Sequence, residues 1–330
     1  MKILIKKNYI KYIVIFIILF TILYTVLWFL IANQVKNNIY LSKNSLFYKN
    51  GFIHDSISVN GYPFKFIICM PQQIIKIGHK TKISFKDMII SSNIFNYKVM
   101  KVISKELNIF TYINENPITF KSQNYQSIIR IDHKKNLYKQ NHSINNSKVL
   151  IKSNKKEINL SIKKINLLTA KENNNLDLRI LFNSISSYNY NDISTDSIYI
   201  DLSLNNLNSF RVSEGYFEVL REDAKINLNN FYFKNKLFNF SANGLLNIDK
   251  EFNLNGKLNF TSYDPMIFIY YLYENKFINI TQYKAIKLIY SISKDIHRNK
   301  IDMPIYLKSS KIFIGPIFIY AMPPINELLF

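Results

Sequence analysis

The chain has 330 residues, of which 48% are hydrophobic and 15% aromatic, so it can bury a core and is not a disordered polar tail. Its formal net charge of +21 comes mostly from lysine, and Ile, Asn, Phe and Tyr are also abundant, a joint bias that indicates AT-rich coding rather than a phosphate-binding surface. The single cysteine, Cys69, excludes an internal disulfide and a multi-cysteine metal site, and its apolar neighbours predict a buried, unreactive thiol.

The first predicted element is the uncharged apolar stretch 12–32. As a helix rising about 1.5 Å per residue, it can cross the roughly 30 Å hydrocarbon core of a bilayer. It is longer than the apolar region of a cleaved signal peptide and has aromatic residues near both ends, which favours a retained anchor over a buried core helix. We predict a stub (1–11), a transmembrane helix (12–32), a stalk (33–50) and a β-rich domain (51–330), with a sub-boundary near 215–235 as an option.

The orientation of this helix is only weakly encoded in the flanking charges. Four lysines precede the span and Lys36, Lys43 and Lys49 follow it, so the positive-inside rule slightly favours a cytoplasmic N-terminus. Because no other stretch approaches 18 uncharged apolar residues, the sequence predicts a single-pass protein with its large domain on the far side of the membrane.

Apolar residues at every second position predict antiparallel strands with one buried and one exposed face. In the first half of the chain, Gly61 and Pro63 are expected at the bend between two strands, and strands are also expected at 83–85 and 97–103. Helices are not expected between the strands, which argues against a parallel α/β fold. The clearest alternating groups lie in the middle of the chain: Ile158/Leu160/Ile162, Leu176/Leu178/Ile180/Phe182, Ile198/Ile200/Leu202/Leu204 and Ala224/Ile226/Leu228.

The last third predicts a β-meander with Gly244 and Gly256 at bends or bulges. Asp264 is expected to cap a helix that has Pro265 at its first position, and Thr281 is expected to cap a second helix. Two further strands follow at 303–307 and 311–314, separated by a serine pair, and the residues expected to end the last strand are Gly315 and Pro316. The fold class is therefore mainly β (α+β), with a large antiparallel domain and two short helices near the C-terminus.

Four features, in this order, carry a resemblance to a known family. They are the N-terminal anchor; V-N-G-Y-P-F-K-F at 59–66, with Gly61, Pro63 and Phe64; the two-helix insertion at 264–294; and M-P-I-Y-L at 303–307 followed by K-I-F-I-G-P at 311–316. The chain resembles the domain-of-unknown-function family 2125, membrane-anchored proteins of Gram-negative bacteria. It departs from that family in its scarcity of Ala, Gly, Arg and Trp and across 116–156.

The resemblance implies a mostly β envelope domain on the periplasmic side of the inner membrane, with no assigned enzymatic activity. The strand pattern is also similar to AsmA-like and tubular lipid-binding architectures, in which a bent sheet shelters acyl chains. That second similarity is an analogy between folds, and a fold does not determine a function.

Candidate chemistry is sparse. Surface positions are expected for the scattered histidines His54, His79, His133, His142 and His297, and the sequence has no nucleophile elbow, P-loop or dinucleotide-binding motif. We therefore predict a non-enzymatic protein without catalytic residues, cofactor or metal, and without nucleic acid as a partner. The basic segment 134–164 is interpreted either as a solvated strand face or as a surface for anionic lipid headgroups, with candidate contacts at Lys152, Lys155, Lys156, Lys163 and Lys164.

Three hypotheses of function follow. A membrane-anchored envelope protein that contacts or carries lipid predicts a concave face lined by the alternating Leu, Ile and Phe positions and not covered by other protein. A structural module that binds other envelope proteins predicts strands that close on their own core. An enzyme requires a polar cleft, for example around His133 or His297 beside a carboxylate.

Overall fold

The computed structural model describes residues 2–41, 53–54, 57–77, 80–113, 116–132, 137–153, 156–187, 194–206, 210–213, 216–219, 225–263, 265–274, 278–293 and 300–324. The helices are α1 (Lys2–Leu41), α3 (Pro265–Glu274) and α4 (Ile280–Ser293). The strands are β1 (Ile53–His54), β2 (Ser58–Asn60), β3 (Lys65–Ile77), β4 (Thr81–Asn93), β5 (Asn96–Ile113), β6 (Asn116–Asp132), β7 (Leu137–Ser153), β8 (Lys156–Glu172), β9 (Asn175–Ser187), β10 (Ser194–Asn205), β11 (Phe210–Ser213), β12 (Tyr216–Val219), β13 (Lys225–Asn235), β14 (Asn239–Ile248), β15 (Leu254–Tyr263), β16 (Lys300–Lys308), β17 (Lys311–Ile314) and β18 (Ile317–Ala321).

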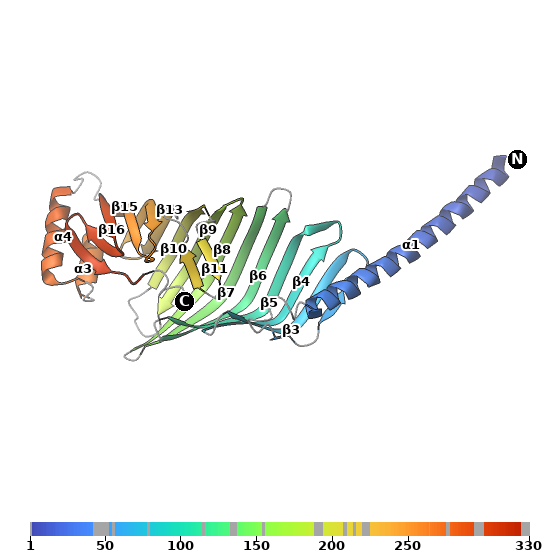
Figure 1. The fold of residues 1–330 in the computed structure, drawn as a ribbon, viewed down its shortest axis with the longest axis horizontal. Coiled ribbons are helices and arrows are strands. Elements are labelled where there is room, and N and C mark those ends of the chain that lie inside the picture. The colour runs from blue at the N-terminus through green and yellow to red at the C-terminus, as the bar shows by residue number, and fades with distance from the viewer. Residues whose placement is uncertain are drawn as a thin grey trace.

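One long antiparallel sheet dominates the described chain and confirms the predicted fold class (Figure 1). It contains 16 of the described strands, which follow one another in sequence order from β3 to β18 except that β11 and β12 form a separate two-stranded sheet. The ladder continues from β10 directly to β13, so the large sheet is continuous between these two strands.

Helix α1 extends from one end of the sheet, whereas α3 and α4 lie at the other end (Figure 1). Within the described residues, the segment Val14–Asn38 of α1 is the one helical stretch long and apolar enough to cross a membrane. This is consistent with a single N-terminal anchor.

The predicted turn at Gly61 and Pro63 is confirmed, because β2 pairs antiparallel with β3 on either side of it. The backbone N–H of Lys65 donates to the carbonyl of Gly61 at 2.9 Å. Gly61 has φ +102°, and a Cβ atom there would lie 2.7 Å from the Lys65 carbonyl oxygen, so glycine is required at this close approach.

The alternation predicted for the middle strands is also confirmed, but in each strand from β3 to β10 it is interrupted once. At the interruption, two successive residues point to the same side of the sheet, away from the apolar residues. We call these pairs the outward doublets: Pro71-Gln72, Lys86-Asp87, Lys105-Glu106, Gln123-Asn124, Asn145-Asn146, Lys163-Lys164, Asn183-Ser184 and Asp196-Ser197.

The outward doublets lie beside one another across eight strands, and because each faces a doublet on the next strand, the register shifts at them only between β6 and β7. Four of them contain a residue with positive φ, namely Asp87, Asn124, Asn146 and Ser184, with φ between 51° and 58°. Asp and Asn adopt this left-handed conformation more readily than other non-glycine residues, which explains three of these four positions. Each doublet interrupts the regular pleat of its strand, as a β-bulge does, so an aligned row of doublets bends the whole sheet along one line.

The side chains along this line show which side of the sheet is concave. On the apolar side, Ser104 and Ser147 are completely buried and Ser122 is almost so. On the opposite side, the bulge residues Asn124 and Asn146 are exposed. The sheet therefore closes toward its apolar side, and small residues occupy the crease because the two halves of each strand converge there.

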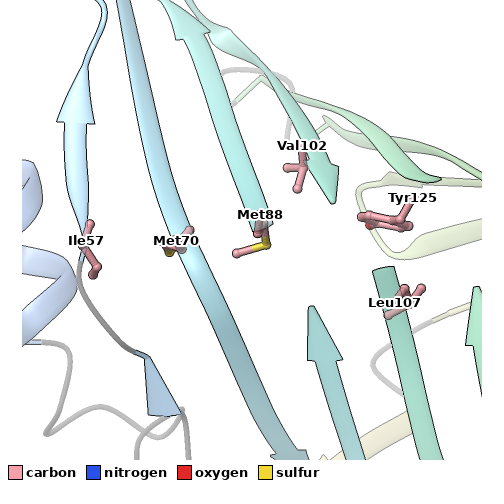
Figure 2. Close-up of a cluster of buried hydrophobic side chains, with 6 residues drawn as sticks. All are labelled: Ile57, Met70, Met88, Val102, Leu107 and Tyr125. Atoms are coloured by element: carbon pink, nitrogen blue, oxygen red, sulfur yellow. The ribbon is translucent and has the colours of Figure 1, made fainter. Parts of the chain in front are cut away.

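Buried apolar clusters occupy the two ends of the sheet. Near α1, the cluster drawn in Figure 2 joins residues of β3 to β6 with one residue just before β2: Ile57, Met70, Met88, Val102, Leu107 and Tyr125. At the other end, α3 packs against β14 to β16 and against α4.

The cap of helix α4 (Ile280–Ser293) lies two residues before the expected one. The Asn279 side chain accepts a hydrogen bond from the N–H of Gln282 at 2.9 Å, and the Gln282 side chain accepts one from the N–H of Asn279 at 2.7 Å. This reciprocal capping box makes Asn279 the cap, so the prediction of Thr281 was wrong. Pro265 is the first residue of α3, as predicted, whereas Asp264 lies outside the described residues.

Candidate functional site

The largest candidate site is the concave side of the sheet, which we call the apolar face. Cross-strand partners form apolar rows that run from strand to strand on this side. One row crosses β4 to β8, and a second crosses β8 to β16. The first consists of Ile83, Ile109, Phe120, Val149 and Leu160; the second consists of Leu167, Ile180, Ile200, Phe231, Ala242, Phe260 and Met303.

The middle of the apolar face remains partly open to solvent. Apolar side chains of β9 and β10 such as Leu178, Ile180 and Ile200 are half-buried, and none of the buried clusters includes a residue of these two strands. Only at the crease do large apolar side chains of β8 become fully buried, at Ile162 and Ile165. In the described chain, the middle of the apolar face is therefore not a closed core.

The C-terminal end of the apolar face is covered by α3 and α4. Phe268 of α3 contacts the rings of Phe238, Phe240 and Phe260, with centroid separations of 5.1 to 6.4 Å. Beneath the helices lies a cavity of about 180 Å³ lined only by apolar residues and proline, including Ile269 and Ile286. This end of the sheet is closed around a small internal space.

One polar cluster interrupts the apolar face near its crease. The Tyr125 hydroxyl lies 2.8 Å from Nδ1 of His142, and Nε2 of His142 lies 2.8 Å from Oε1 of Gln140. Because an amide oxygen only accepts, Nε2 carries the proton and Nδ1 accepts from the tyrosine. Burial lowers the pKa of His142 and raises the pKa of the Tyr125 hydroxyl, so both groups are neutral near pH 7.

This geometry corrects the expectation that His142 is a surface residue, since it is half-buried on the apolar face. Both ring nitrogens are engaged within the sheet, by a tyrosine hydroxyl and an amide oxygen and not by a carboxylate. His133 and His297, the residues that the enzyme hypothesis requires, lie outside the described residues. Among the residues that the structure describes, no group of three or more His, Cys, Asp or Glu could hold a metal ion.

The opposite, convex side of the sheet carries polar and charged groups. Across neighbouring doublets, Lys105 pairs with Asp87 at 2.8 Å and Lys86 pairs with Glu106 at 3.3 Å. The hydrogen bond from Lys105 holds the pKa of the Asp87 carboxyl below its ordinary value. These ion pairs are largely solvated, so they contribute little to stability.

The candidate headgroup lysines are on this convex side where the structure describes them. Lys163 and Lys164 form the doublet of β8 and are exposed, and Lys152 is exposed opposite Glu157. Lys155 and the side chain of Lys156 lie outside the described residues. None of the three described side chains points into the apolar face.

The remaining motif residues have structural positions. Gly244 lies opposite the bulge of β13, between Leu228 and Leu258, whereas Gly256 lies in a regular part of the ladder between Leu246 and Leu307. Gly315 and Pro316 form the turn between β17 and β18, a strand that the sequence analysis did not anticipate. Cys69 is a free, half-buried thiol rather than a fully buried one.

The sequence analysis missed the outward doublets, although they leave a readable signal. Within a strand pattern of period two, a spacing of three between inward residues marks an outward doublet, as between Ile162 and Ile165 or between Phe182 and Ile185. The same step recurs in eight consecutive strands, so it is a repeated feature of the chain.

The chain matches no family model, no curated protein and no solved structure.

Proposed function

We propose that this chain is a non-enzymatic, membrane-anchored envelope protein whose apolar face binds the acyl chains of lipids. The observation that carries the proposal is the pair of apolar rows on the concave side, which both reach β8 and leave side chains of β9 and β10 half-buried and not closed over by the described chain. A contiguous exposed apolar surface on a soluble domain indicates a binding site for an apolar partner.

The dimensions of the apolar face suit lipid. Twelve strands lie side by side from β3 to β16, and neighbouring strands are about 4.8 Å apart, so the face extends for about 50 Å. One leaflet of a bilayer contributes about 15 Å of hydrocarbon, half of the membrane core. The chains of one lipid would occupy a fraction of this length, so the face has room for several lipids or for movement of one lipid along it.

The lipid proposal is tested by extraction and mass spectrometry of the full-length protein purified in detergent. Because α1 also retains lipid in detergent, the informative comparison is between two variants of β9. Leu178→Glu places a charge on the apolar face, and Leu181→Glu places the same charge at a half-buried leucine on the convex side of the same strand.

We expect phospholipid or glycolipid to co-purify with the unmodified protein and with Leu181→Glu, and to be reduced with Leu178→Glu. Equal lipid content in both variants would assign the lipid to α1 and refute binding by the sheet. If a protein co-purified in place of lipid, the apolar face would instead belong to an interaction module of the envelope.

The proposed location is the inner membrane, with the N-terminus in the cytoplasm and the sheet in the periplasm. The apolar helix supports a membrane anchor. The proposed orientation is supported by the flanking lysines. It is also supported by the resemblance to the domain-of-unknown-function family 2125, which is itself proposed. Alkaline phosphatase fused to the C-terminus is expected to be active, and activity only from a cytoplasmic fluorescent reporter would reverse the orientation.

A further inference from the structure

Four aromatic side chains are exposed at two neighbouring turns beside α1. The turn before β3 presents Tyr62 and Phe64, which are 42% and 57% exposed. The turn between β4 and β5 presents Phe95, which is 76% exposed, and Tyr97 at the start of β5 is 68% exposed. We call these four residues the aromatic turns. Phenylalanine in such exposed positions is unfavourable in water, so the aromatic turns require a partner.

The two turns form one unit. The backbone N–H of Ile94 donates to the carbonyl of Phe64 at 3.1 Å, and the rings of Phe64 and Phe95 are 6.3 Å apart. The side chain of Asn93 accepts from the N–H of Phe95 at 2.9 Å, which fixes the second turn. The aromatic side chains are therefore held in place by the backbone.

This unit is attached to one face of the anchor helix. The Trp28 ring is 3% exposed, stacks on Phe66 at 5.5 Å and meets the edge of Tyr62 at 5.6 Å. The Thr25 hydroxyl is hydrogen-bonded to the Tyr62 hydroxyl at 2.6 Å, and the Tyr24 hydroxyl donates to the carbonyl of Pro63. Residues 24, 28 and 32 are spaced by four, so they share one side of the helix.

These contacts determine the depth of the aromatic turns relative to the anchor. Tyr24 and Trp28 lie within the uncharged stretch 12–32, and Tyr24 is eight residues before its end. At about 1.5 Å per residue, the Pro63 carbonyl is held about 12 Å along the helix axis below the end of that stretch. The opposite sides of this segment, including Leu23, Leu27 and Leu30, are exposed.

We propose that the aromatic turns are inserted into the leaflet that adjoins the sheet, so that the bilayer itself is the partner of these four side chains. The proposal depends on α1 spanning the membrane and does not require the apolar face to bind lipid. The rings suit this depth because transfer of a large apolar ring from water to hydrocarbon is favourable. Phe66, which contacts Trp28, lies on the same side of β3 as Ile68 and Met70, so insertion places one end of the apolar face at the level of the bilayer.

The test measures the depth of single labelled positions in vesicles. In a Cys69→Ser background, Phe95→Cys and Leu237→Cys are each labelled with an environment-sensitive fluorophore, and the full-length proteins are reconstituted into phosphatidylcholine vesicles that contain nitroxide-labelled lipid. Leu237 is a matched control because it is 59% exposed in a turn next to β14, far along the sheet from α1.

We expect the label at position 95 to lose most of its emission to the nitroxide lipid and the label at position 237 to lose little. Equal quenching at both positions would refute insertion. The single tryptophan, Trp28, provides the folding control, since its emission before labelling must be the same in both cysteine variants. Repeating the measurement on Leu178→Glu separates the two proposals, because loss of lipid from the apolar face should leave quenching at position 95 unchanged.

Discussion

Replacing Gly244 with alanine should destabilise the sheet severely, because the added Cβ has no space. It would lie 2.2 Å from the carbonyl oxygen of Lys257 and 2.9 Å from Cα of Leu258, both backbone atoms of the adjacent strand. Strand β15 would therefore have to move by most of an ångström. Gly244 also has φ +153°, where other residues are strained. Strain costs about 1–3 kcal/mol and overpacking about 1–3 kcal/mol, so we expect a loss of about 2–6 kcal/mol.

Gly315→Ala is the matched control for this substitution. Gly315 also has positive φ, at +57°, but the nearest atom to an added Cβ is the tip of Ile289 at 3.9 Å. Only the left-handed strain of about 1–2 kcal/mol applies there. Urea unfolding of the full-length proteins in detergent, followed by the β signal in circular dichroism, compares the two. A loss for Gly244→Ala no larger than that for Gly315→Ala would refute the close-contact argument.

Three further outcomes are expected. A photoreactive phenylalanine analogue that replaces Ile200 on the apolar face should crosslink to lipid in membranes. The same analogue in place of Tyr199, on the convex side, should not. Equal crosslinking at the two positions would contradict the assignment of the faces. Burial lowers the pKa of His142, so protonation of this side chain favours the unfolded state. The free energy of unfolding should therefore fall as the pH drops below about 6.5, by up to about 1.4 kcal/mol per pH unit. In urea unfolding, His142→Gln should show a shallower dependence on pH. Asn279→Ala should lower the unfolding free energy by about 1 kcal/mol and Thr281→Ala by less, whereas the reverse order would restore the original cap prediction.

The alternation of apolar and polar residues was sufficient to predict strands and their faces in the middle of the chain. Ile158, Leu160 and Ile162 share the apolar face as expected, because a side-chain period of two leaves no other arrangement in a strand. The start of α3 at Pro265 was likewise predictable from local backbone chemistry. Local signals of this kind do not depend on the rest of the fold.

The features that sequence analysis missed depend on neighbouring strands. Lys163-Lys164 was interpreted as a basic surface, although the pair is also the outward doublet of β8 and faces Asn183-Ser184 in β9. Likewise, the hydrogen bonds of His142 require Tyr125 on the adjacent strand, so its buried position could not be read from its own segment. The pairing that aligns these residues is set by contacts between strands, not by either strand alone.

The bend also explains how so long an apolar face can exist beside water. A flat sheet with one apolar side needs a second layer to cover it, and the described chain supplies helices only at the ends. Bending along the doublets brings the two halves of each strand together, so Ser104, Ser122 and Ser147 are buried at the crease without any covering layer. Larger side chains such as Leu178 and Ile200 stay half-buried beside the crease, where an apolar ligand can reach them. The doublet that recurs in every strand from β3 to β10 supplies this bend at the same level of each strand.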